Sequence, residues 1–453
     1  MKKKILIVIN SNNFVRNYIE SKAFKIINKH YECHYLFVEK KNYLDFKKND
    51  KTEASFLEIN KFFKKLYNFK IKINFFINPY KSKTVKYLNK KLLKQKLIFR
   101  EKNHFFSLIF YLRLANKFKN NINYKLRFFY MSFLKFFNFL GSLYFSKIIF
   151  NKIKPNLIIF PYQHDDVHFA SVLKLVKKQI PFIGLVDNWD NLSSKSNLDI
   201  LPDFITVWGK QSAEHAIKYQ GFKKKNVFVI GTPRYNEYFK LRNKRIKSKF
   251  NFKYILFLES FFCYNNSVEL KILDNFINKN SKFKNYKIIY RPHPWQKKHN
   301  INLDNLNLKS VIIDPQIKHN YMNKIFDTSF QPSLKYYPSL IKNADIVITG
   351  PTSMLLESTI FKKKTLLLGY KNYSDINYYD QLRNFVHLKG IQNFSNVVLC
   401  KNLKNLEIDL INIFKMKQQK FMHKIDKERD FYLFHNREGY SSRLNKIISA
   451  IIR

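Results

Sequence analysis

The chain has 453 residues, 45% of them apolar, and its 83 Lys and Arg against 32 Asp and Glu give a formal net charge of +51. This length exceeds what one hydrophobic core normally covers, so two domains of ordinary size are expected. No uncharged run approaches the about twenty residues that a membrane-spanning helix needs. The three cysteines, Cys33, Cys263 and Cys400, have neither metal-type nor disulfide spacing.

The N-terminus, MKKKILIVINSNN, has a charged start but an apolar core of residues 5–9 only. This core is too short for a signal peptide, so the stretch predicts a first buried strand in a cytoplasmic protein. The charge predicts attraction to an anionic surface or substrate, although A/T-rich codons account for part of the Lys excess. The expected location is the cytoplasm, with peripheral binding to the inner face of the cell membrane as an option.

Strand-like and helix-like runs alternate along the first half, which is typical of a parallel sheet with helices on both faces. The strand-like runs are 4–9, 34–38, 156–160, 181–186, 203–208 and 226–231. The helix-like runs are 14–27, 166–178 and 210–221. Together they predict one α/β domain.

Residues 101–154 differ from the rest of the chain, with sixteen aromatic residues, ten Lys or Arg and one acid, Glu101. Within 126–150 the polar positions fall on one narrow helical stripe, so the apolar face is wide. Two interpretations stay open. The segment is either a helix buried in the first domain or an in-plane membrane helix whose cations meet anionic lipid.

A basic stretch without apolar periodicity, residues 240–253, reads as a linker. Strand-like runs resume at 254–258, 286–290, 310–313, 344–349 and 364–369. We therefore predict an N-terminal Rossmann-like domain over 1–240, which includes 101–154, and a C-terminal Rossmann-like domain over 250–453. The helical segment 403–453 is expected to pack back across the pair.

Polar groups follow two strands of the second half. Arg291 and His293 come directly after one strand, in YRPHPWQ, and the flanking prolines restrict the backbone. The second strand ends in Gly350-Pro351-Thr352-Ser353 ahead of a helix. Ligands of open parallel sheets lie outside the carboxyl ends of the strands, where helix N-termini offer N–H groups to phosphate.

Each group has a proposed role and a plainer alternative. The Gly allows close backbone approach, the two hydroxyls add donors, and Glu357, one turn further along the helix, is placed to accept bonds from ribose hydroxyls. Arg291 and His293 would stabilise a phosphate leaving group. Alternatively, Thr352 and Ser353 cap a helix and His293 is an ordinary loop residue.

These residues carry a resemblance. The second half resembles the nucleotide-binding domain of GT-B glycosyltransferases, nearest the branch of CDP-glycerol glycerophosphotransferases, bacterial polysialyltransferases and capsule Kdo transferases. His293-Pro294 matches the His-Pro motif of that branch, and Thr352-Ser353 matches its Ser/Thr-Ser motif. The resemblance spans roughly residues 155–370 and implies two Rossmann-like domains facing across a cleft. It also implies that His293, Thr352 and Ser353 contact the phosphate of the donor.

The first domain of such an enzyme carries the acceptor and usually the catalytic base, for which two stretches qualify. YQHDD offers His164, Asp165 and Asp166, and DNWDNLSSK offers Asp187, Asp190 and Asn191. A carboxylate at a strand end can take the proton of an attacking hydroxyl, and Asp187 or Asp190 is preferred. Related glycerophosphotransferases have a His-Gly pair near the second stretch, where this chain has Asp187-Asn188-Trp189-Asp190, so the identity of the base stays open. Turn and cap roles for Asp187, Asp190 and Asn191 remain an equal alternative.

No Asp-X-Asp pair is present, so we expect a transferase that needs no metal and no cofactor. Its predicted partners are a nucleotide-sugar or CDP-polyol donor and a glycan or lipid-linked acceptor of surface polysaccharide or capsule biosynthesis, with an anionic membrane surface as a further option. Nucleic acid is not expected, because no nucleic-acid motif is found. Two alternatives remain: a sugar-nucleotide epimerase of the same fold, and a non-catalytic basic protein at the membrane.

Overall fold

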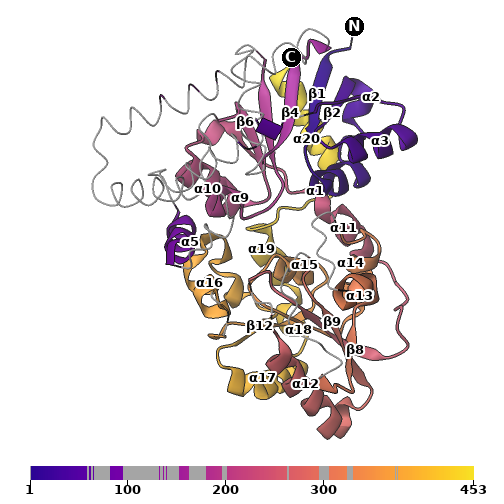
Figure 1. The fold of residues 1–453 in the computed structure, drawn as a ribbon, viewed down its shortest axis with the longest axis vertical. Coiled ribbons are helices and arrows are strands. Elements are labelled where there is room, and N and C mark those ends of the chain that lie inside the picture. Colours follow the sequence, from indigo (N-terminus) through magenta and orange to yellow (C-terminus); the bar gives the residue numbers. More distant parts are fainter. Residues whose placement is uncertain are drawn as a thin grey trace. The chain divides into compact units, whose positions relative to one another are not determined.

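The computed structural model describes residues 2–58, 61–62, 65, 82–94, 132, 136, 139, 153–162, 180–195, 201–262, 265–294, 306–323, 330–372, 374 and 376–452. The chain forms two compact units. The first comprises Met1–Arg234 with Leu433–Arg453, and the second comprises Tyr235–Tyr432. Each unit holds one parallel sheet together with helices (Figure 1). The predicted α/β class is confirmed.

The sheet of the first unit has seven strands in the described part of the chain, in the order β3-β2-β1-β4-β5-β6-β7. The strands are β1 (Lys4–Ile9), β2 (Glu32–Phe37), β3 (Glu53–Phe56), β4 (Leu157–Tyr162), β5 (Phe182–Val186), β6 (Phe204–Val207) and β7 (Val227–Val229). All strand-like runs predicted for this half are confirmed. The edge strand β3 was not predicted. It has only four residues, which are mixed in polarity and at least partly exposed.

The described helices of the first unit are α1 (Asn12–Phe14), α2 (Ile27–His30), α3 (Lys40–Asn49), α5 (Lys83–Lys94), α9 (Asn191–Ser194), α10 (Lys210–Gln220) and α20 (Tyr440–Ile451). The predicted helix 210–221 is α10, which ends where Gly221 adopts a φ of 81°, a left-handed conformation that favours glycine. The run 14–27 is divided instead into α1, a π-helical turn (Val15–Glu20) and α2. The run 166–178 lies outside the described residues.

Helix α20 belongs to the first unit. Its Tyr440, Leu444 and Ile448 are spaced four residues apart, and all three pack into the hydrophobic core with β1. Figure 1 shows this yellow helix beside the indigo strand β1, and both chain ends lie in this unit. The last residues therefore join the first unit, whereas the sequence counted them with the second domain, 250–453, as part of a helical segment, 403–453, that packs back across the pair.

The sheet of the second unit has six strands in the described part of the chain, in the order β10-β9-β8-β11-β12-β13. They are β8 (Lys253–Leu258), β9 (Tyr286–Arg291), β10 (Val311–Ile313), β11 (Ile346–Thr349), β12 (Lys364–Leu368) and β13 (Val397–Cys400). The sequence predicted all of them except β13, an edge strand with three partly exposed residues.

The described helices of the second unit are α11 (Asn236–Arg242), α12 (Ser267–Lys279), α13 (Pro315–Met322), α14 (Tyr336–Asn343), α15 (Met354–Ile360), α16 (Tyr378–Asn384), α17 (Leu406–Lys415), α18 (Gln419–Met422) and α19 (Ile425–Asp430). The unit begins at Tyr235, ahead of the predicted break near 240, because α11 packs against the second unit. Its Tyr238 ring stacks on Phe361 at 5.7 Å. In the described part of the chain, no helix has both the length and the apolar character needed to cross a bilayer.

Candidate functional site

The topology of the second sheet marks one place at its edge. The chain runs outward from β8 through β9 to β10, returns to β11 beside β8, and continues outward on the other side. The order of the strands therefore reverses between β8 and β11. Ligands of open parallel sheets bind outside the carboxyl ends of the strands at such a reversal.

Three loops meet at this reversal, and we call residues 259–261, 292–294 and 349–353 the strand-end cluster. The backbone N–H of His293 donates to Oε2 of Glu259 at 2.6 Å, which joins the loops after β9 and β8. A Cβ on Gly350 would lie 3.1 Å from Cβ of Ser260, so the loops after β11 and β8 also touch. The sequence placed His293 and Gly350 on one site, and the structure brings their loops to adjoining strand ends.

The side chain of His293 is half-buried. Its imidazole packs edge-on against the ring of Phe261, with 5.2 Å between the ring centroids. Phe261 is itself 46% exposed. The ring of Phe261 packs against the imidazole of His293. Because both side chains are partly exposed, a ligand can reach the pair.

The loop after β11 is packed tightly. A Cβ on Gly350 would lie 2.5 Å from the ring of Tyr378, so only glycine fits there. Thr352 and Ser353 are both half-buried, and Oγ1 of Thr352 accepts from the N–H of Met354 at 3.3 Å. The capping alternative therefore holds for Thr352. Ser353 occupies the N-cap position of α15, yet its side chain makes no capping hydrogen bond.

Arg291 does not belong to this cluster. Its guanidinium is buried, where it pairs with Asp314, donates to Oε1 of Gln316 at 3.0 Å and lies 4.6 Å from the ring of Tyr337. The predicted phosphate contact needs a cation that is available to a ligand. Arg291 instead stabilises the packing of β9 against α13 and α14.

Glu357 is likewise occupied within the unit. Its carboxylate is fully buried and accepts from the hydroxyls of Tyr235 at 3.3 Å and Tyr238 at 3.1 Å. These bonds connect α15 to α11 and to the turn before it. The predicted role as an acceptor for ribose hydroxyls requires exposure that Glu357 does not have.

The first unit shows where DNWDNLSSK lies. Asp187 directly follows β5, is fully buried, and accepts from Nδ2 of Asn17 at 2.8 Å. Asp190 stands at the N-cap position of α9 and accepts from Oγ of Ser194 at 2.5 Å. Asn191 is buried and donates to the carbonyl of Tyr162 at 2.8 Å. These contacts connect the stretch to the π-helical turn after α1 and to β4, and the Asp190 side chain makes no capping hydrogen bond to α9, so the structure favours a structural role without the expected cap.

Some predictions fall outside the described residues. His164, Asp165 and Asp166 do so, and so does almost all of 101–154. Among the residues that the structure describes, no group of three or more His, Cys, Asp or Glu is placed to hold a metal ion. The expectation of a metal-independent enzyme stays a prediction.

Two functional candidates were missed at the sequence level, Glu259 and Phe261. Burial raises the pKa of the Glu259 carboxyl to about 8, against the opposing effect of the His293 N–H bond. Glu259 directly follows the strand-like run 254–258 and Phe261 comes two residues later, so the rule that pointed to His293 applies to them as well. A glutamate after YILFL matches no motif, so the sequence alone does not single it out.

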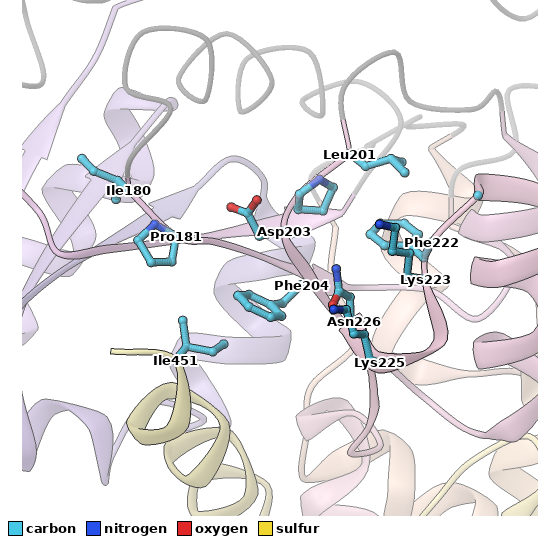
Figure 2. Close-up of a pocket in the computed structure, with 12 residues that line it drawn as sticks. Ile180, Pro181, Leu201, Asp203, Phe204, Phe222, Lys223, Lys225, Asn226 and Ile451 are labelled. Carbon is cyan, nitrogen blue, oxygen red and sulfur yellow. The ribbon is translucent and has the colours of Figure 1, made fainter. Parts of the chain in front are cut away.

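Two pockets in the described part of the chain were compared with the predicted site residues. The first, with a volume of about 680 Å³, lies in the first unit at the amino ends of β5 and β6, where Asp203, Phe204 and Ile451 line it (Figure 2). This is the sheet edge opposite the carboxyl ends, and none of the predicted site residues that the structure describes lines it. The second, of about 370 Å³, lies at the carboxyl edge of the second sheet, beside Glu269 and Asn372.

Comparison with known proteins establishes the fold. No protein-family profile and no curated protein sequence matches the chain. A UDP-GlcNAc 2-epimerase from Methanocaldococcus jannaschii is similar in structure, with a TM-score of 0.53, 11% identity and 99% coverage of both chains. A glycosyltransferase from Rickettsia africae ESF-5 has a TM-score of 0.50 and 12% identity, and covers 100% of this chain and 99% of its own.

A putative UDP-N-acetylglucosamine 2-epimerase from Listeria monocytogenes gives a TM-score of 0.53 at 10% identity, over 100% of this chain and 96% of that chain. At such identities the likeness shows the fold alone. Together with the two parallel sheets, it establishes that this chain has the α/β fold of GT-B enzymes, with two Rossmann-like units.

Proposed function

We propose that the chain is a glycosyl- or glycerophosphotransferase of surface-polysaccharide biosynthesis that uses a nucleotide-activated donor. The observation that carries this proposal is the strand-end cluster at the reversal of the second sheet. It joins His293, a glycine-based loop and the half-buried hydroxyls of Thr352 and Ser353. The fold is one that both transferases and nucleotide-sugar epimerases use.

The chemistry follows from these groups. The loop 350–353 offers backbone N–H groups and two hydroxyls to a diphosphate, and Gly350 lets the backbone come close. The imidazole of His293 donates to an oxygen of the leaving phosphate, which gains negative charge as its bond to the transferred sugar breaks or, in glycerophosphotransfer, as its bond to the transferred phosphorus breaks. We assign the acceptor side and its base to the first unit, with YQHDD preferred because Asp187 is buried and Asp190 is bonded to the Ser194 hydroxyl.

A second candidate is an epimerase that acts on the same donor without an acceptor. Solved epimerases share the fold at TM-scores of 0.53. Incubation with UDP-GlcNAc alone separates the two functions. An epimerase changes the sugar, whereas a transferase leaves the donor intact until an acceptor is added.

The test is a comparison of two histidine variants after a thermal-shift screen against CMP, CDP, UDP, GDP and their sugar or polyol conjugates. His293→Ala should lower turnover by about a hundredfold or more, as the loss of one transition-state donor does. His319→Ala is the matched control, because His319 is exposed on α13. Equal turnover in both variants would remove His293 from the site.

The expected independence from metal ions has its own test. Chelation with EDTA should leave turnover unchanged.

A further inference from the structure

Asp426 of α19 is a carboxylate that binds three cations of the second unit. The guanidinium of Arg242, at the end of α11, donates to both of its oxygens, at 2.8 and 2.6 Å. Arg429, on α19 itself, donates to Oδ1 at 2.5 Å, and Nζ of Lys362 lies 3.1 Å from Oδ2. A two-point pair between an arginine and a carboxylate fixes orientation as well as distance, so Asp426 joins these elements in one geometry.

Lys362 connects this carboxylate to the strand-end cluster. It follows α15, which ends at Ile360 and begins directly after loop 350–353. The side chains of residues 355–360 are all buried, so α15 is packed along most of its length. A closely packed element transmits a displacement instead of absorbing it. Movement at the end of α15 therefore reaches the loop at its start.

The backbone of Lys362 is strained. Its φ of 53° lies in the left-handed region, which glycine adopts readily and lysine does not. Such strain persists only where the surroundings hold the residue, and it is concentrated at functional sites. The ammonium of Lys362 binds Asp426 and the carbonyl of Met422, the latter at 2.9 Å. A glycine would relieve the backbone here but would lose both contacts.

Helix α11 gives Asp426 a second connection to α15. Its Tyr238 donates to the carboxylate of Glu357 at 3.1 Å, and Arg242 lies one turn further along the same helix. In the described part of the chain, α11 is the first α-helix of the second unit and α19 is the last. Elements at the ends of a folded unit loosen unless contacts hold them. Asp426 holds both of them to the helix that follows the phosphate loop.

We propose that Asp426 and Lys362 are positioning residues, which fix α15 so that loop 350–353 keeps the shape that binds the donor diphosphate. The inference rests on the proposed function, because that function assigns the diphosphate to this loop. Both residues act through α15 and not by contact with the donor. A loop that already has its binding shape loses less conformational entropy when the ligand arrives, so release of α15 should weaken binding.

The first experiment measures the affinity of the full chain for UDP and CDP by calorimetry. Asp426→Asn should lower the affinity by about tenfold, a change typical of residues that act through a packed element. Glu428→Gln is the matched control on the same helix, because the Glu428 carboxylate accepts the N–H and Oγ of Ser395, both at 2.9 Å, and so holds α19 to another loop. It should bind as the wild type does. An equal loss of affinity in both variants would overturn the proposal.

Lys362→Gly separates positioning from stability. Glycine adopts the left-handed backbone without strain, which offsets the added freedom of the unfolded chain, so urea unfolding should stay close to wild type. The affinity should nevertheless fall by about fivefold, because the contact with Asp426 is lost. Wild-type affinity in both Lys362→Gly and Asp426→Asn would contradict the positioning role.

Hydrogen–deuterium exchange of the ligand-free chain tests the anchor without a nucleotide. Peptides that cover residues 350–360 should exchange faster in Lys362→Gly than in the wild type, and Glu428→Gln should leave them unchanged. Unchanged exchange in Lys362→Gly would overturn the anchor itself. If the wild type binds neither nucleotide while exchange rises in Lys362→Gly, the proposed function fails, and with it the role in donor binding, whereas the anchoring of α15 stands.

Discussion

The second-unit strand-end cluster and the turn after β5 in the first unit look alike in sequence, yet they differ in structure. Both place polar residues after buried strands. In the cluster, the half-buried His293 and Ser353 remain within reach of solvent. In the turn, Asp187 is fully buried and Asp190 is bonded to Ser194. A polar strand end is therefore a candidate site only where its side chains keep some exposure and are not buried against other elements.

The largest expected effect is on stability, at Arg291, which is buried in an ion pair although it lies in the same YRPHPWQ stretch as His293. Arg291→Ala should lower the free energy of unfolding by about 3 to 5 kcal/mol, because it leaves Asp314 buried without its cation. Urea unfolding measures this change. Arg383→Ala, at an exposed position on α16, is the control and should stay close to wild type. A stable Arg291→Ala protein that has lost nucleotide binding would return Arg291 to the site.

The next effect tests the close packing of the cluster. Gly350→Ala should cost about 1 to 3 kcal/mol of stability and weaken nucleotide binding, because the added methyl group displaces Tyr378. Gly439→Ala is the matched control, since no atom lies within 4 Å of its added Cβ. Thermal unfolding and calorimetry of both variants measure the difference. If Gly350→Ala binds nucleotide as the wild type does, the loop does not receive the phosphate.

Substitutions in the turn after β5 of the first unit should lower the free energy of unfolding. Asp187→Ala should cost about 1 to 3 kcal/mol because the buried amide of Asn17 loses an acceptor. Asp190→Ala should cost about 1 kcal/mol through the loss of the Ser194 bond. Nucleotide binding to the second unit should survive in both variants. Loss of transfer in a variant that is still folded at the assay temperature would restore the role of catalytic base.

Hydrophobic periodicity and strand ends predicted most of the fold. Long buried runs such as Lys4–Ile9 were found because a strand covered on both faces is apolar throughout. The edge strand β3 was missed because its residues are mixed in polarity, whereas β13, with the apolar run VVLC, carries the same pattern as the predicted edge strands β7 and β10. The sequence predicted a helical end that packs back, but not that α20 belongs to the first unit, since its apolar stripe fits any sheet and only tertiary contacts select this one.

For the candidate site, the sequence located the loops but not the state of each side chain. His293 and Ser353 were predicted, and the structure leaves them within reach of a ligand. The pairing of Arg291 with Asp314 joins residues 23 positions apart, which no local pattern reveals. Glu259 was missed because its significance depends on burial, which is a property of the folded chain.

The smallest effect concerns residues 101–154, which lie almost entirely outside the described residues. Ten cations and one acid give attraction to anionic lipid of about 1 kcal/mol per Lys or Arg near the surface. The chain should sediment with anionic vesicles at low salt, release partly as salt rises, and bind zwitterionic vesicles less. A chain that stays in the supernatant with anionic vesicles would favour the buried-helix interpretation and a soluble acceptor.

The most direct test of the central claim is hydrogen–deuterium exchange of the wild type with and without UDP or CDP. The account predicts slower exchange in peptides that carry residues 350–353 and His293, because their N–H groups contact or neighbour the phosphates. Peptides that cover α9 should exchange at the same rate in both states. Protection of the α9 turn with no change at residues 350–353 would contradict the account.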